Sequence, residues 1–201
     1  MRKAKVSRKT NETDIEAEVN LDGAGKSSIS TQIAFFTHLL ESFSRWSGFD
    51  VRIKAIGDIE TDQHHTIEDI GIVIGKTIRK ALGEMKGVNR AGYFVMPMDD
   101  ALSIVAVDIS GRPYLQYKCK FKRRFCGSFD TDVLEDFFYG FSMGAGCNIT
   151  VRIVDGRSDH HKIEAVFKAF GRALKMACSV DKSMAEEIPS TKGVIANDCY
   201  N

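Results

Sequence analysis

The 201-residue sequence has only three prolines, no clear excess of charge of either sign and no long apolar run. Its 28 basic residues are nearly balanced by 27 acidic ones, so no long-range field draws the protein to nucleic acid or to an anionic membrane. The basic N-terminus lacks the apolar stretch of a signal peptide, and no segment approaches the roughly 18 apolar residues of a membrane helix. Apolar residues make up 43% of the chain and charged residues 27%, which predicts a globular protein of the cytoplasm.

The cysteines show no sequence pattern typical of disulfide bonding, zinc binding or catalysis. The five cysteines are Cys119, Cys126, Cys147, Cys178 and Cys199. Their number is odd and none forms a CxxC pair, which argues against a disulfide framework and against a zinc ribbon. Without a distinctive local motif, a catalytic role for one of them is less expected than a packing or surface role. We therefore expect reduced thiols.

The sequence contains an internal repeat. Aligning Ser44 with Ser142 also brings together, apart from a two-residue difference in loop length, two HHxxE motifs that begin at His64 and His160. Internal repeats reveal architecture before any detailed assignment. The alignment divides the chain into a first repeat, a second repeat and a C-terminal tail, with expected bounds 1–86, 87–180 and 181–201.

Hydrophobic periodicity predicts the elements of each repeat. Alternating or β-rich runs precede each repeated block. Apolar positions after His65 recur at three- and four-residue steps and end at Gly83, as in a helix. Residues 148–154 alternate with period two and are β-branched, as in a half-buried strand. We expect an α+β fold built by tandem duplication of a β-β-β-α-β-α unit, each unit a small mixed sheet with two helices on one face.

All five histidines lie in the repeated blocks. Residues three or four apart share a helix face, so the histidines of each HHxxE motif can converge with Glu68 or Glu164. Adjacent histidines point about 100° apart, which suits two ions better than one. Asp136, the repeat partner of His38, completes the candidate ligands: His38, His64, His65, Glu68, Asp136, His160, His161 and Glu164. Imidazole with carboxylate suits manganese, iron or zinc, and the share of carboxylate makes manganese our first expectation.

Other interpretations of these motifs remain open at this point. Their acidic residues could simply stabilise helix N-termini. The HHxxE motif is superficially similar to the zincin motifs HExxH and HxxEH, but its residue order differs and a zincin leaves the duplication unexplained. A purely structural metal site would be closed by four ligands and would need no basic residues nearby.

Further motifs occur in a fixed order along the chain: FFTHLLESFSRWSGFD, GDIETDQHHTIEDIGIVIG, MDDALSIVAVDISGRPYL, FDTDVLEDFF, HHKIEAVFKAFGRAL and PSTKG. In this order and spacing the chain resembles the imidazoleglycerol-phosphate dehydratase family across essentially its whole length. The resemblance implies a lyase of histidine biosynthesis that converts D-erythro-imidazoleglycerol phosphate to imidazole acetol phosphate. It also implies a fold similar to a domain of a small-subunit ribosomal protein.

The resemblance implies a mechanism with two Mn²⁺ ions. The imidazole ring of the substrate would lie between the ions, which act as Lewis acids and as a template. A carboxylate would remove the proton next to the ring, and the neighbouring hydroxyl would leave through a diazafulvene-like intermediate. A general base must lie within hydrogen-bond reach, so we expect Glu164 first and Glu12 second. Glu12 matches a substrate-contacting glutamate of the family; on its own it is a polar residue in a turn.

The resemblance also implies a set of substrate contacts. Besides Glu12, the matching residues are Arg90, Arg112, Ser190, Thr191 and Lys192. Planar guanidinium groups suit bidentate contacts with phosphate oxygens, although either arginine alone would pass for a solvated surface charge. Lys168 lies four residues after Glu164, on the same helix face, and is a further expected contact.

Two positions depart from the family pattern. Asp136 stands where many members have histidine and others glutamate, and Thr191 replaces a common serine but keeps the hydroxyl.

The resemblance also implies an assembly. The family builds its sites between neighbouring copies of a 24-subunit shell, so we expect a homo-oligomer that metal removal weakens. The alternatives are a metal-dependent hydrolase of a phosphorylated small molecule and a metal-stapled assembly protein without catalysis.

Overall fold

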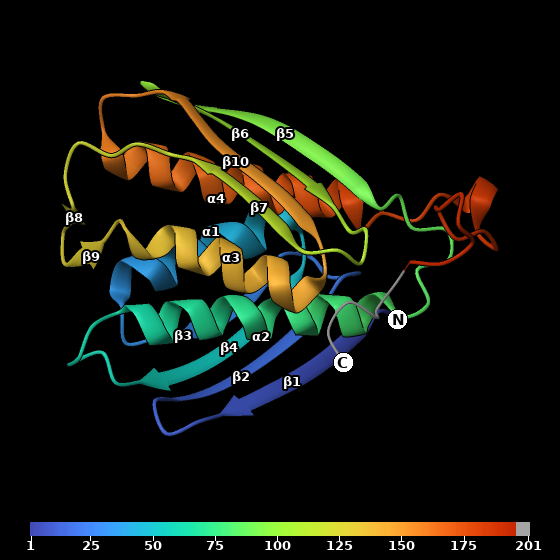
Figure 1. The fold of residues 1–201 in the computed structure, drawn as a ribbon, viewed down its shortest axis with the longest axis horizontal. Helices are drawn as coiled ribbons and strands as arrows, with labels where there is room; N and C mark the ends of the chain where they lie inside the picture. The colour runs from blue at the N-terminus through green and yellow to red at the C-terminus, as the bar shows by residue number, and fades with distance from the viewer. Residues whose placement is uncertain (196–201) are drawn as a thin grey trace.

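Two four-stranded sheets enclose four helices in the computed structural model, which describes residues 1–195 (Figure 1). The first repeat contains β1 (Lys3–Lys9), β2 (Thr13–Asn20), β3 (Ser27–Ser30), α1 (Ala34–Ser47), β4 (Asp50–Gly57) and α2 (His64–Leu82). The second contains β5 (Ala91–Met98), β6 (Ala101–Asp108), β7 (Tyr114–Lys118), β8 (Phe125–Cys126), β9 (Phe129–Asp130), α3 (Val133–Ala145), β10 (Asn148–Asp155) and α4 (Asp159–Ala177). A short 3-10 helix, Lys182–Met184, follows. The predicted α+β class and repeated β-β-β-α-β-α order are confirmed.

The two sheets have the same topology. Their strand orders are β1-β2-β4-β3 and β5-β6-β10-β7. In each sheet the edge strand β3 or β7 pairs in parallel with its neighbour, and the other pairings are antiparallel. A parallel pair requires a crossover, which α1 and α3 provide. The second repeat also contains the hairpin β8–β9, which the sequence did not predict because two-residue strands carry no readable periodicity.

Helices α1 and α3 have the same hydrogen bonds and backbone conformation at their C-termini, at residues that the repeat alignment makes equivalent. The hydroxyls of Ser44 and Ser142 each donate to the carbonyl five residues further on, at 2.9 and 2.6 Å. Gly48 and Gly146 follow with φ angles of 74° and 63°, a left-handed conformation that favours glycine at the end of a helix.

Each pair of packed helices combines both repeats. The helices lie between the sheets (Figure 1), with α1 packed on α4 and α2 on α3. A Cβ atom on Gly75 of α2 would lie 2.5 Å from the Phe141 carbonyl oxygen, and one on Gly171 of α4 would lie 2.8 Å from that of Phe43. The helices therefore meet backbone to backbone, which fixes the relative positions of side chains on their first turns.

One hydrophobic core runs through both repeats. Phe36 of α1 packs edge to face on Phe137 of α3, with ring centroids 5.4 Å apart, and Phe137 stacks on Phe167 of α4. Aromatic pairs of this geometry add to the stabilisation from apolar burial. The expected boundaries at residues 86 and 180 fall between α2 and β5 and after α4, while the core crosses the first of them.

The cysteines of the described chain, residues 1–195, are free thiols. Burial raises the pKa of Cys178 to about 12 and also raises the pKa of Cys147, so both thiols stay protonated and act as small apolar groups. Cys199 lies outside the described residues. Within the same range, no helix has the length and apolarity needed to cross a membrane.

Candidate active site

The predicted metal ligands lie on the first two turns of the four helices, at one end of the molecule, which we call the cluster end. His64 and His65 begin α2, and His160 and His161 follow the first residue of α4. Figure 1 shows that the helices begin at the same end of the structure. The cross-repeat helix packing then divides the side chains between two clusters.

The α1/α4 cluster consists of His38, His160 and Glu164. Oε2 of Glu164 lies 3.8 Å from Nε2 of His38 and 3.4 Å from Nε2 of His160. The other oxygen, Oε1, lies 2.9 Å from Nζ of Lys168. The side chain of Glu164 is only 12% exposed, so it forms the buried centre of the cluster.

Opposing effects act on the Glu164 carboxyl. Burial works to raise the pKa of Glu164, but the hydrogen bond and charge of Lys168, helped by His38 and His160, outweigh it and the pKa is lowered. The carboxylate is therefore ionised at neutral pH. This state suits a ligand of a cation, whereas a general base works best with a pKa near the operating pH.

The α2/α3 cluster consists of the equivalent residues His64, Glu68 and Asp136. Nε2 of His64 lies 3.8 Å from Oε2 of Glu68, and Nδ1 of the same ring lies 3.0 Å from Oδ2 of Asp136. Glu68 is more accessible than its counterpart, with 31% of its side chain exposed. The two clusters are similar in composition and differ in geometry.

His65 and His161 belong to neither cluster and face the hairpins instead. Nδ1 of His65 lies 3.1 Å from Asp58, and its Nε2 lies 3.9 Å from Glu12 at the β1–β2 turn. The hydrogen bond that the protonated ring donates to Asp58 raises the pKa of His65 against the opposing effect of burial, and the charge of Glu12 adds to the rise. The two histidines of the first motif therefore have different partners, as their angular separation predicts.

The second motif repeats this arrangement. Nδ1 of His161 lies 2.7 Å from Asp100, and its Nε2 lies 3.6 Å from Asp99 at the β5–β6 turn. Sequence reasoning missed Asp99 and Asp100, as it missed Asp58 in the first repeat. The available signal was an aspartate shortly before the first HHxxE motif and the paired aspartates of a tight turn.

A buried carboxylate fastens the Glu12 hairpin to α2. Asp69 accepts a hydrogen bond from the Thr13 hydroxyl at 2.5 Å and pairs with the guanidinium of Arg8. Arg8 is the second-last residue of β1 and Thr13 begins β2, so both arms of the hairpin are tied to the helix that carries His65. Buried charges that are paired in this way hold one geometry.

Five of the expected substrate contacts lie together at the opposite end, which we call the tail end: Arg90, Arg112, Ser190, Thr191 and Lys192. A hollow of about 180 Å³ is lined by Arg90, Ser110, Arg112, Ser190, Thr191, Lys192 and Val194. Nε and Nη2 of Arg90 lie 2.7 and 3.0 Å from the oxygens of Asp108, and Nη1 donates to the Pro189 carbonyl at 2.9 Å. The pair with Asp108 raises the pKa of Arg90. Arg90 thus fastens the tail, while Arg112 and Lys192 add positive charge to the hollow.

The length of α4 separates the two ends. The backbone N–H of Arg90 donates to the carbonyl of Ala177, the last residue of α4. Since α4 has 19 residues and rises 1.5 Å per residue, the cluster end and the tail end lie about 28 Å apart. Lys168 is at the middle of α4, and its ammonium group reaches Glu164 of the α1/α4 cluster. One small molecule cannot contact both ends of the same chain.

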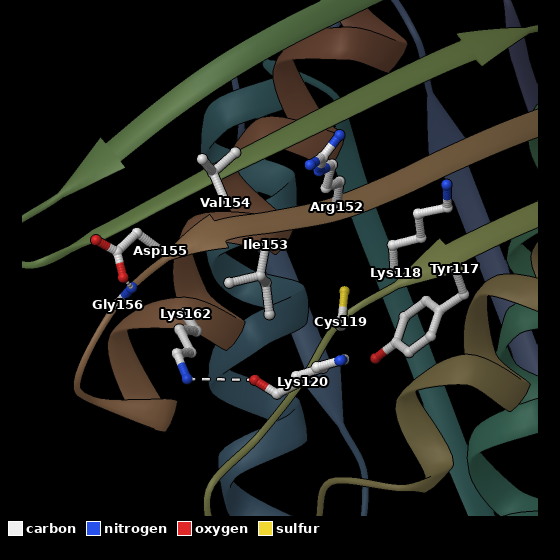
Figure 2. A pocket seen from close by; sticks show the side chains of 10 residues that line it. All are labelled: Tyr117, Lys118, Cys119, Lys120, Arg152, Ile153, Val154, Asp155, Gly156 and Lys162. Carbon is white, nitrogen blue, oxygen red and sulfur yellow. Dashed lines mark hydrogen bonds between the residues drawn. The ribbon is translucent and has the colours of Figure 1, made fainter.

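A larger hollow of about 560 Å³ lies where β7 and β10 part (Figure 2). None of the expected site residues lines it. Nζ of Lys162 donates to the Lys120 carbonyl at 3.2 Å and pairs with Asp159. Burial raises the pKa of Cys119 in its wall to about 12, so that thiol is a poor nucleophile.

The donor chemistry of both clusters fits a divalent ion. Among residues 1–195 no three histidine, cysteine or acidic side chains are gathered tightly enough to hold an ion by themselves. The Nε2 to Oε2 separations of 3.4 to 3.8 Å compare with about 3 Å between adjacent ligands at typical bond lengths of roughly 2.1 Å. Small side-chain movements and further ligands from outside the chain would complete each set of donors.

The fold and these clusters define a class, duplicated α+β enzymes with imidazole and carboxylate groups converging at the helix starts. A family model described as "Imidazoleglycerol-phosphate dehydratase" matches residues 31–174. The chain belongs to this family and is accordingly a carbon–oxygen lyase of the hydro-lyase kind. The resemblance noted from the sequence motifs is thereby confirmed.

Relatives and solved structures agree over nearly the full length. The chain is 52% identical over 195 residues to the imidazoleglycerol-phosphate dehydratase of Koribacter versatilis. The aligned region covers 97% of this chain and 100% of the relative. The corresponding protein of Acetivibrio thermocellus is 48% identical, covering 96% and 99%. The Pyrococcus furiosus structure of this family is 36% identical and superimposes with a TM-score of 0.82, covering 94% of this chain and 99% of its own.

Proposed function

We propose that the protein dehydrates imidazoleglycerol phosphate to imidazole acetol phosphate in histidine biosynthesis. The observation that carries the proposal is that a chain of this family has two sets of side chains, one at each end, that suit different parts of the substrate. Imidazole and carboxylate side chains gather at the cluster end, and arginine, lysine and hydroxyl groups gather at the tail end. The first set suits the ring of the substrate, and the second suits its phosphate.

The proposed active site holds two divalent ions, with manganese as the first choice. The α1/α4 cluster would hold one ion and the α2/α3 cluster the other. His65 and His161 would supply further imidazoles from neighbouring copies, because their Nε2 atoms point away from both clusters of their own chain, toward the hairpin carboxylates. When bound, the ions would supply Lewis acidity and a template for the imidazole ring.

We assign the proton transfer to Glu12 and a ligand role to Glu164. The Glu164 carboxylate is buried and paired with Lys168, and its lowered pKa makes it a weaker base. Glu12 lies on a hairpin turn with 54% of its side chain exposed, and its Oε1 is 3.9 Å from His65. It can therefore approach a substrate bound at the surface, while Asp69 holds its hairpin in place.

The separation of the two ends supports an assembly. A substrate bound at the cluster end of one copy would receive its phosphate contacts from the tail end of another. A homo-oligomer with sites at its subunit contacts, as in the 24-subunit shell of the family, meets this requirement. We also place the enzyme in the cytoplasm, where the four free thiols of the described chain stay reduced.

The direct test is turnover of imidazoleglycerol phosphate by metal-stripped protein before and after addition of Mn²⁺, with Glu164→Gln as the inactive control. We expect manganese to restore formation of a ketone that absorbs in alkali and retains its phosphate. Release of inorganic phosphate would instead identify a hydrolase. If assembled, metal-loaded protein leaves the substrate untouched, the proposal is wrong.

A further inference from the structure

The two clusters differ at the position where the repeats pair His38 with Asp136. In the α1/α4 cluster, Nε2 of His38 faces Oε2 of Glu164 at 3.8 Å. In the α2/α3 cluster, Asp136 and Glu68 contact different nitrogens of the His64 ring. Oδ2 of Asp136 lies 3.0 Å from Nδ1 of His64, whereas Glu68 lies 3.8 Å from Nε2 of the same ring.

The two nitrogens of an imidazole ring point in diverging directions, so a group bound at Nδ1 stands outside the coordination sphere of an ion at Nε2. A carboxylate at Nδ1 fixes the tautomer, because it accepts the proton there and leaves the lone pair on Nε2. Asp136 therefore occupies the place of an orienting partner of His64. His38 occupies the place of a ligand.

The same orienting arrangement occurs twice more at the cluster end. Asp58 lies 3.1 Å from Nδ1 of His65, and Asp100 lies 2.7 Å from Nδ1 of His161. In both cases Nε2 faces another carboxylate. The contact of Asp136 with His64 thus follows a pattern that this chain uses repeatedly.

We infer that Asp136 is a positioning residue that orients His64, and that the two ion sites of the proposed function are therefore unequal. The α1/α4 site draws three donors from its own chain, namely His38, His160 and Glu164, and the α2/α3 site draws only His64 and Glu68. The second ion binds more weakly. This inference rests on the proposed two-ion site.

Burial and charge act on the two sites in opposite directions. Glu164 is 12% exposed and Glu68 is 31% exposed, so water competes less at the α1/α4 site. Lys168 opposes a cation there, and its counterpart in the first repeat is the uncharged Ile72. The ammonium pairs with Oε1, however, and leaves Oε2 facing both imidazoles. The additional imidazole, that of His38, therefore decides which of the two sites binds its ion more tightly.

The test is a titration of metal-stripped full-length protein with Mn²⁺, followed by calorimetry and by the electron paramagnetic resonance signal of free Mn²⁺. We expect two binding steps per chain that differ at least about tenfold in Kd, since changes around a metal site alter affinity by 10 to 100-fold. His38→Ala should weaken the tighter step, and Glu68→Gln should weaken the other. Asp136→His, which makes the repeats alike at this position, should bring the two steps together.

Substitutions of Asp136 separate orientation from coordination. An amide oxygen still accepts a hydrogen bond from Nδ1 but is a poorer ligand than a carboxylate. We therefore expect Asp136→Asn to weaken the second step by no more than about tenfold and Asp136→Ala by about a hundredfold, with the first step unchanged. Glu135→Gln, which removes the same charge from an exposed neighbour, should change neither step.

Two results would overturn the inference while leaving the proposed function standing. One is a single class of equal sites in active wild-type protein. The other is equal loss of the second ion in Asp136→Asn and Asp136→Ala, which would make Asp136 a ligand. Failure of the wild-type protein to bind any Mn²⁺ would overturn both this inference and the proposed two-ion site.

Discussion

The first and second repeats share a backbone plan and differ in the side chains placed on it. Ile72 of α2 lies where α4 has Lys168, and buried Asp69 lies where α4 has Ala165. The first repeat holds its hairpin through Asp69, whereas Asp100 of the second binds the N–H groups that precede α4. Duplication thus supplied two equivalent frameworks, and divergence of single residues gave each a different task.

The hairpin turns provide the largest expected contrast. Glu12→Gln keeps the shape of the side chain but removes the proposed base, so we expect kcat to fall by about 10² to 10⁴-fold, the usual contribution of general acid–base catalysis. Asp99→Asn, the matched change in the second repeat, should alter kcat by less than about threefold. The measurement is steady-state kinetics on manganese-loaded protein. Equal losses in the two variants would mean that the hairpins have equivalent roles.

The glycine contacts test whether the two helix pairs are equally tight. A Cβ on Gly75 would meet the Phe141 carbonyl at 2.5 Å, and one on Gly171 would meet that of Phe43 at 2.8 Å. Overpacking against backbone should lower the free energy of unfolding by about 3 kcal/mol in Gly75→Ala and about 2 kcal/mol in Gly171→Ala. The higher helix propensity of alanine offsets only part of this cost.

Urea unfolding at fixed metal and protein concentrations measures both glycine variants. Lys76→Ala, at an exposed position of α2, is the control and should stay within about 0.5 kcal/mol of wild type. A negligible effect of both glycine substitutions would show that the helices can move apart without cost.

The third prediction compares the contributions of Arg112 and its counterpart Lys26 to substrate binding. Arg112 lines the hollow at the tail end, whereas exposed Lys26, its counterpart in the first repeat, is not among the residues that line it. Arg112→Ala should raise KM by about 10 to 100-fold with kcat nearly unchanged, because a charged hydrogen bond to phosphate contributes roughly 1.5 to 3 kcal/mol. Lys26→Ala should leave KM unaltered. A fall in kcat without a change in KM would contradict the assignment.

The smallest expected effect is at two equivalent positions, the first residues of β4 and β10. Asp50 accepts from the N–H groups of Ala24 and Lys26, whereas Asn148 donates to the Ser110 hydroxyl and the Arg112 carbonyl. Hydrogen bonds from the backbone of Lys26 and Ala24 hold the pKa of Asp50 below its ordinary value of 3.8. The resulting stabilisation is present above pH 4 and is lost as the pH falls through the lowered pKa.

Asp50→Asn removes this pH-dependent contribution. Because the side chain is partly exposed, we expect a loss of at most about 1 kcal/mol in unfolding free energy at pH 7, shrinking as the pH falls below 3.8 and through the lowered pKa of Asp50. Urea unfolding of both proteins across this range gives the difference directly. A difference independent of pH would rule out the ionised carboxylate as its source.

The sequence predicted those features whose signals are local. Helical periodicity and the two HHxxE motifs gave the repeats, the helices and the eight candidate ligands. The division of these ligands was not readable, because it depends on α1 packing against α4 and α2 against α3. The orienting aspartates Asp58 and Asp100 escaped notice because their function depends on which ring nitrogen they face, and that is set by the folded backbone.

The placement of the expected phosphate contacts shows the same limit. Arg90 and Lys192 are about a hundred residues apart in the chain, and only the fold brings them into one hollow with Arg112. Their separation from the histidines depends on the contact of Arg90 with the end of α4. The two-residue strands β8 and β9 were missed for the opposite reason, because they are too short to carry a periodic pattern.

The central claim is that the cluster end of one copy and the tail end of another form one active site. It is tested most directly by mixing two impaired variants, one with Glu164→Gln and one with both Arg112→Ala and Lys192→Ala. The chains are mixed without metal and reassembled with Mn²⁺, and turnover is measured at low substrate concentration. Random mixing should restore about a quarter of the wild-type rate, because half of the cluster ends and half of the tail ends are intact. Activity no higher than the sum of the separate variants, in verified mixed assemblies, would contradict the account.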